Sequence, residues 1–188
     1  MYVESLSIPE VKIISAKKIG DDRGFFSETY NRNSLSEYSI DIDFVQDNHS
    51  LSSKAGVLRG LHFQKPPYAQ DKLVRVIKGN IWDVAVDLRP NSPYYKKWAA
   101  AEVSSENWSQ VLVPKGFAHG FVTLEENTEV IYKVSNYYNP ESEVSIMWND
   151  ETLDIDWPIE AADVVLSHKD AVGLSFSSLE EELSTYSW

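Results

Sequence analysis

Arg59, His62 and Lys72 stand out because each lies in or beside a segment with the pattern of a buried β-strand. Ionisable side chains are rarely buried without a partner or a task, since removing a charge from water is costly. A histidine can give and take protons near neutral pH, and a lysine or arginine can hold an anion. The three residues therefore indicate a functional site that is mounted on a rigid β scaffold.

The distribution of charge also favours a local site. The formal net charge of −12 argues against broad binding to nucleic acid or to a membrane surface. Five basic residues nevertheless fall within one short stretch, namely Arg59, Lys65, Lys72, Arg75 and Lys78. A basic cluster in an acidic protein suits an anionic small molecule such as a phosphorylated metabolite.

Composition limits the class of protein. The chain of 188 residues is 43% hydrophobic, which predicts one folded domain over residues 1–188. It contains no cysteine, so disulfides, thiolate metal sites and thiol nucleophiles are excluded. The N-terminus lacks the pattern of a signal peptide, and no apolar run has the length of a membrane span. We therefore expect a cytoplasmic protein with no membrane partner.

Short strand-like runs rich in Val, Ile, Phe, Tyr and Trp predict an all-β fold of antiparallel sheets. Turn residues such as those at 22–24, 79–80 and 114–116 separate them. Only 33–39 and 178–183 have the pattern of short helices, the second with Ser178 as its N-cap. The expected strands are 11–19, 25–30, 44–49, 57–63, 73–77, 81–88, 99–103, 110–113, 121–124, 129–134 and 145–148.

Strand alternation gives a specific expectation around His62. In a regular strand Leu58, Gly60 and Gln64 share the face of His62, whereas Arg59 lies on the opposite face. Both charged side chains can reach one site only if Gly60 bends or bulges the strand, which glycine permits.

The order of several motifs resembles the dTDP-4-dehydrorhamnose 3,5-epimerase family of the cupin superfamily. The resemblance spans roughly residues 8 to 171, so it rests on much more than one motif. It implies a cupin-type jelly roll that forms a homodimer, with the N-terminal arm 1–30 crossing to the partner subunit. The matching segments are 21–28, 46–50, 57–64, 69–76, 83–89, 114–121, 131–133, 137–140 and 166–170.

The same resemblance implies the reaction. The family converts a dTDP-4-keto-6-deoxyhexose by inverting C3 and C5 through an enolate, without a cofactor, as in dTDP-L-rhamnose biosynthesis. By matching motif, His62 is the base and Asp170 orients its imidazole. Lys72 holds the enolate oxygen, and Tyr132 returns a proton from the other side of the ring. Such chemistry needs a base, a donor at the ketone oxygen and an acid on the opposite face.

The residues that the resemblance assigns to substrate binding come from the arm and from several strands. Arg23 and Arg59 are expected at the diphosphate, where a guanidinium fork suits paired oxygens. The remaining contacts are expected at the thymine (Phe26, Tyr138 and Glu28), at the sugar (Gln46, Asn48 and His119), behind Lys72 or His119 (Asp83) and at the substrate (Lys169).

Other interpretations stay open at this point. Tyr132 could be a barrel-filling aromatic, and Phe26 could belong to the core. A metal-dependent cupin is less suited, because Phe63 and Gln64 follow His62 where a second histidine ligand is typical. The chain could also be a binding module without activity, or an epimerase that inverts a single carbon. The tail from Ala171 onward departs from the family's usual ending.

Overall fold

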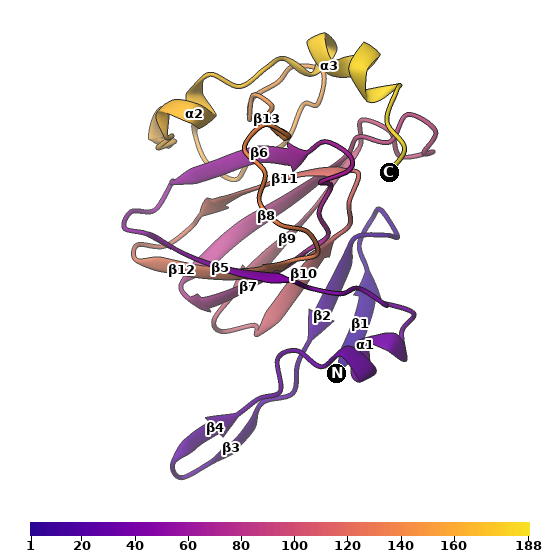
Figure 1. Cartoon of the computed structure of the whole chain (residues 1–188). Helices are drawn as coiled ribbons and strands as arrows, with labels where there is room; N and C mark the ends of the chain where they lie inside the picture. The colour runs from indigo at the N-terminus through magenta and orange to yellow at the C-terminus, as the bar shows by residue number, and fades with distance from the viewer.

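The computed structural model describes all residues, 1–188, and consists mainly of two antiparallel sheets that face each other (Figure 1). The prediction of an all-β fold with a few short helices is confirmed. The six-stranded sheet contains, in spatial order, β1 (Tyr2–Ser5), β2 (Lys12–Ser15), β10 (Ser109–Val113), β7 (Lys72–Lys78), β12 (Thr128–Val134) and β5 (Gln46–Ser52).

The second sheet has five strands and carries Arg59 and His62 on β6, whereas Lys72, Arg75 and Lys78 lie on β7 of the first sheet. Its spatial order is β13 (Glu143–Ser145), β6 (Leu58–Gln64), β11 (Phe117–Thr123), β8 (Asn80–Asp87) and β9 (Trp98–Ser104). Neighbouring strands in each sheet are often far apart in sequence, so the chain passes repeatedly between the two sheets. This topology brings residues from distant segments into the space between the sheets.

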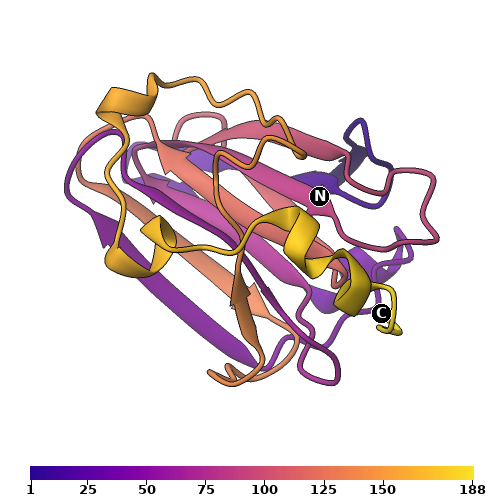
Figure 2. The same ribbon diagram turned by 90° about the horizontal axis from the view of Figure 1, so that it is seen from above.

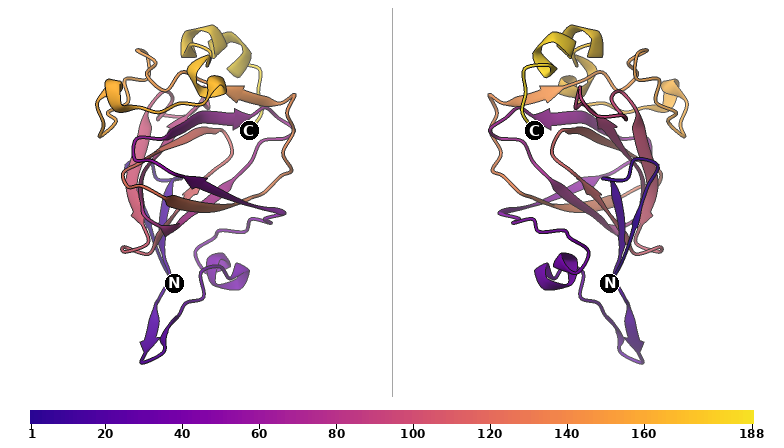
Figure 3. Two further views of the ribbon diagram at one scale, coloured as in Figure 1. Left: turned by 90° about the vertical axis from the view of Figure 1, so that its left-hand side faces the viewer. Right: turned by 90° about the vertical axis from the view of Figure 1, so that its right-hand side faces the viewer.

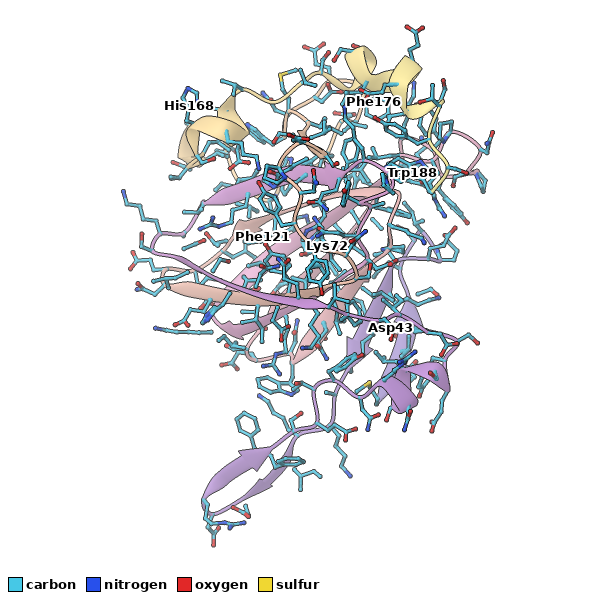
Figure 4. All side chains as sticks on the ribbon, viewed as in Figure 1. Asp43, Lys72, Phe121, His168, Phe176 and Trp188 are labelled. Atoms are coloured by element: carbon cyan, nitrogen blue, oxygen red, sulfur yellow. The ribbon has the colours of Figure 1, made fainter.

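Apolar side chains fill much of the space between the sheets. Val74, Val76, Val111 and Val130 from the six-stranded sheet form one cluster with Ala85 and other residues of the five-stranded sheet. Phe121 belongs to this cluster and lines the same cavity as Lys72, and both residues lie in the central part of the molecule (Figure 4). The apolar core therefore borders the polar residues around Lys72.

The C-terminal part of the chain covers the outer face of the five-stranded sheet (Figure 2). Helices α2 (His168–Ala171) and α3 (Phe176–Leu183) belong to this layer, together with the 3₁₀ turn η1 (Ala161–Asp163). Phe176, Leu179 and Leu183 pack there against strand residues such as Val84 and Val86. Helix α3 begins at Phe176 with Ser175 as its N-cap, so the prediction of Ser178 as the N-cap was wrong.

A hairpin formed by β3 (Ile19–Asp21) and β4 (Gly24–Phe26) projects away from both sheets (Figures 1 and 3). The predicted single strand 11–19 is thus divided between β2 and β3, because residues 16–18 leave the sheet. Helix α1 (Arg32–Ser36) follows the hairpin and is capped by the side chain of Asn31. Phe26 is 69% exposed, which rules out a core role within this chain.

Candidate active site

A β-bulge in β6 places Arg59 and His62 on the same face. His119 on β11 pairs with His62, and Phe121 pairs with Arg59. The pairing advances two residues on β11 but three on β6, so β6 contains one extra residue at Gly60. Both charged side chains therefore face the space between the sheets, and the predicted bend at Gly60 is confirmed.

Gly60 is required for this geometry. Its φ of 121° lies in a region of backbone conformation that residues other than glycine rarely adopt. A Cβ atom at this position would lie only 2.6 Å from the Cα of Gly120. The bulge also turns Leu58 to the opposite face, into the layer under the C-terminal helices. The expectation that Leu58 shares the face of His62 was wrong for this reason.

His62 is paired with a carboxylate from the C-terminal layer. Its Nε2 lies 2.7 Å from Oδ1 of Asp170, which is 5% exposed and belongs to α2. The Ser167 hydroxyl donates to Oδ2 of Asp170 at 2.6 Å, and the Gly60 N–H donates to Oδ1 at 3.3 Å. Burial alone would raise the pKa of Asp170, but hydrogen bonds from His62 and Ser167 outweigh it and hold the pKa below its ordinary value.

Lys72 lies deep in the sandwich at the start of β7. The residue as a whole is only partly buried, but its ammonium group is enclosed, and burial lowers its pKa to about 8. The negative charges of Asp83 and Glu143 oppose this effect by favouring the charged form. Nζ has one long hydrogen bond, 3.4 Å to the carbonyl oxygen of His62. The ammonium therefore keeps donor capacity for a ligand.

Tyr132 reaches the same space from β12. Burial raises the pKa of its phenol, and the charge of Glu143 adds to this effect while Arg59 opposes it. The phenol is therefore protonated at neutral pH and can donate a proton or a hydrogen bond. Tyr132 packs at the border of the central apolar cluster, so it also has a structural contact there.

Two cavities, of about 250 and 330 Å³, meet at these side chains. Both are lined by His62, Lys72, Tyr132, Tyr138 and Glu143. Further predicted residues line one cavity or the other, namely Gln46, Asn48, Arg59, His119, Lys169 and Asp170. Most of the residues expected to bind the sugar or do the chemistry are thus brought together by the fold.

Asp83 and His119 form a second buried pair behind the cavity. Nε2 of His119 lies 2.8 Å from Oδ2 of Asp83, and both side chains are buried. Oδ1 of Asp83 has no hydrogen-bond partner, and its charge favours the protonated form of Lys72. Asp83 therefore contacts His119 directly and acts on Lys72 through its charge, which agrees with its expected place behind one or the other of these residues.

Glu143 is a cavity residue that sequence reasoning missed. It accepts a hydrogen bond from the Tyr138 hydroxyl at 2.7 Å and forms an ion pair with Lys169 at 2.6 Å. Although burial opposes it, these contacts hold the pKa of Glu143 below its ordinary value. Glu143 belongs to a stretch of sequence that is rich in acidic residues, and its place at the cavity follows only from the pairing of β13 with β6, where it lies opposite Gln64.

Three predicted binding residues lie away from the cavities within a single chain. Arg23 and Phe26 belong to the projecting hairpin, and Glu28 follows it; all three are exposed. The Arg23 guanidinium is engaged by the carboxylate of Asp21 at the tip. Their expected role therefore requires a second subunit and stays a prediction here.

Two further features bear on the alternative functions. No group of three or more His, Asp or Glu side chains is arranged to hold a metal ion. No helix is long and apolar enough to cross a membrane.

The His–Asp pair and the enclosed lysine and tyrosine, held between two sheets of a cupin-like fold, suit an enzyme that transfers protons. Residues 5–178 match the family model described as dTDP-4-dehydrorhamnose 3,5-epimerase. The chain belongs to this family, which confirms the resemblance and the expected class of enzyme, an isomerase. The last ten residues, 179–188, lie outside the match.

Individual relatives are similar over nearly the whole chain. The dTDP-4-dehydrorhamnose 3,5-epimerase of Escherichia coli is 50% identical over 171 residues, which cover 90% of this chain and 91% of the relative. The 3,5-epimerase of Legionella pneumophila, solved with dTDP-4-keto-L-rhamnose, has a TM-score of 0.93 at 44% identity, covering 100% and 98% of the two chains. The Bacillus anthracis epimerase with TDP and PPi bound has a TM-score of 0.89 at 46% identity, covering 93% and 99%.

Proposed function

We propose that this chain epimerises a dTDP-4-keto-6-deoxyhexose at C3 and C5 through an enolate, in the synthesis of a dTDP-L-rhamnose precursor. The observation that carries the proposal is the meeting of His62, Lys72 and Tyr132 at one cavity, with Asp170 paired to His62. Family membership supports the same reaction. The roles of these residues come from the family resemblance, and the geometry adds that their side chains meet at one place.

His62 begins the reaction by taking the proton from a carbon next to the ketone. The electron pair of the broken C–H bond forms a C=C bond to the carbonyl carbon, and the π electrons of the C=O bond move onto the oxygen, which gives an enolate. Asp170, held as a carboxylate, stabilises the imidazolium that results and fixes the orientation of the ring. The Lys72 ammonium stabilises the negative oxygen, because an enclosed charge acts strongly where little water screens it.

Tyr132 completes each inversion by giving its proton to the same carbon from the opposite face. The enolate electrons re-form a C–H bond there, and the ketone is restored. His62 then loses its proton and Tyr132 regains one from solvent, so the enzyme returns to its starting state. The same cycle at the second carbon gives the double epimer, and no atom or electron is gained or lost overall.

The nucleotide is bound between two subunits in this proposal. Arg23, Phe26 and Glu28 lie on or beside a hairpin that projects away from its own sheets (Figure 3). An exposed hairpin that carries a guanidinium and two phenylalanines is suited to complete the site of a second copy. In a homodimer each hairpin would thus contribute nucleotide contacts to the site of its partner. A cytoplasmic location stays a prediction.

Incubation with dTDP-4-keto-6-deoxyglucose in D₂O tests the reaction. NMR should show deuterium at both C3 and C5 with wild-type protein, and none above background with His62→Asn. Deuterium at one carbon alone would show a single-position epimerase. Absence of exchange while dTDP still binds would contradict the proposed activity and favour a binding module.

A further inference from the structure

The indole of Trp108 contacts the β3–β4 hairpin at its root, beside a hydrogen bond of 3.2 Å from Lys18 Nζ to the carbonyl oxygen of Ser105. Lys18 precedes the first strand of the hairpin, and its Nζ lies 3.9 Å from the centroid of the Trp108 ring. Ser27 follows the second strand, and its hydroxyl accepts a hydrogen bond from Trp108 Nε1 at 2.9 Å. Phe25 packs edge-on against the same indole with 5.0 Å between ring centroids. Trp108 thus contacts both legs of the hairpin where they leave the body.

Trp108 is itself fixed from the side of the main sheet. The guanidinium carbon of Arg75 on β7 lies 5.4 Å from its ring centroid. Trp108 has a left-handed backbone, with φ of 56°, in a turn that Asn107 organises. The Asn107 side chain accepts hydrogen bonds from the N–H groups of Ser104 and Ser109, at 3.0 and 3.1 Å. The indole therefore has a defined position to which the hairpin is attached.

Beyond this root the hairpin has little support within the chain. Ile19, Phe25 and Phe26 are all more than half exposed, and the views agree that the strands extend into solvent (Figures 1 and 3). Arg23 at the tip lies about 15 Å along the chain from the root, at about 3.3 Å per extended residue. A tilt of about ten degrees at the root would move the tip by about 2–3 Å, whereas binding groups must be held within about 0.5 Å.

We infer that Trp108 is a positioning residue for nucleotide binding, because it sets the direction in which the hairpin presents Arg23 and Phe26. The inference rests on the proposed role of the hairpin at a partner's site. Trp108 lines neither of the two cavities, so it acts through the hairpin and not on the reacting sugar. Its removal should therefore weaken binding of the nucleotide and leave the proton transfers at His62 intact.

The test measures dTDP binding by calorimetry and the kinetics of the complete enzyme. Trp108→Ala should raise the Kd for dTDP and the KM for the sugar nucleotide by about tenfold, with kcat within about twofold of wild type. Trp98→Ala is the matched control: its indole donates to the carbonyl oxygen of Asp154 and contacts no hairpin residue. The control should leave both Kd and KM unchanged.

A second pair of variants keeps the inference testable if Trp108→Ala does not fold. Trp108→Phe keeps a ring beside Lys18 and Arg75 but removes the donor to Ser27, and Ser27→Ala removes the acceptor. Each should weaken dTDP binding by about two- to threefold, and the double variant should be no worse than either, since all three lose the same hydrogen bond. If the losses of dTDP affinity in the two single variants add up in the double variant, the hydrogen bond between Trp108 and Ser27 is not their common cause.

Arg23→Ala separates the inference about Trp108 from the proposal that the hairpin binds the nucleotide. If Arg23→Ala weakens dTDP binding but Trp108→Ala does not, Trp108 is not a positioning residue, whereas the role of the hairpin in binding stands. If neither variant changes dTDP affinity, the hairpin does not bind nucleotide and both ideas fail. A fall in kcat as large as the rise in KM would also overturn the inference, because it would show an effect on the chemistry.

Discussion

His62 and Asp170 are 108 residues apart in sequence, yet their side chains meet at 2.7 Å. One residue lies in the five-stranded sheet and the other in the C-terminal layer that covers it, so the pair forms only when that layer is in place. Asp170 also bonds to the N–H of Gly60, which ties the pair to the bulge that orients His62. Base, carboxylate and bulge are therefore one structural unit.

Asp170→Asn should lower turnover by about 10²-fold or more, because the imidazolium loses its counter-charge and the ring its orientation. The affinity for dTDP should change little, since Asp170 is not among the residues proposed to contact the nucleotide. Ser167→Ala is the control: it removes one hydrogen bond to Asp170 but keeps the carboxylate, and should cost only a few-fold. Equal losses in the two variants would show that the carboxylate has no special role.

The pKa of Lys72 predicts how activity depends on pH. The ammonium form is needed to stabilise the enolate, and its pKa is about 8, so kcat/KM should fall as pH rises through about 8. Asp83 raises this pKa by its charge. Asp83→Asn should therefore move the alkaline fall to lower pH.

Lys72→Arg is the control for the alkaline fall, because a guanidinium does not titrate in this range. Whatever activity the variant keeps should show no fall near pH 8. A fall that persists unchanged in both variants would assign it to another group.

Gly60→Ala should destabilise the protein by about 1–3 kcal/mol, because the bulge requires a positive φ and the added methyl meets the backbone of Gly120. Gly24→Ala separates the two causes. Gly24 has a similar φ of 130° at the hairpin tip, but nothing lies within 4 Å of an added Cβ. Denaturant unfolding should show the larger loss for Gly60→Ala, and equal losses would mean that the close contact with Gly120 has no cost.

Mixing two inactive or weakened variants tests whether the arm crosses between subunits. Arg23→Ala keeps His62, and His62→Asn keeps Arg23. A mixed dimer with crossing arms contains one site with both wild-type residues, so activity at low substrate concentration should exceed the sum of the separate variants. Absence of any gain after subunits have exchanged would indicate that each arm serves its own subunit.

Strand alternation and turn residues were enough to predict the all-β fold, because they are local properties of the chain. The sequence also contained the motifs that identify the family, and with them His62, Lys72, Tyr132 and Asp170. The possibility of a bulge at Gly60 could be stated, since only glycine tolerates that backbone. The choice between a bulged and a regular strand required the pairing with β11.

Tertiary structure alone decided which distant residues share an environment. Glu143 became a cavity residue through the pairing of β13 with β6, although its neighbours in sequence suggest an exposed acidic segment. The enclosure of Lys72, which lowers its pKa, depends on both sheets at once. The attachment of the hairpin to Trp108 joins segments 81 residues apart. Local sequence determines backbone preference, whereas burial and charge depend on what the remainder of the chain places nearby.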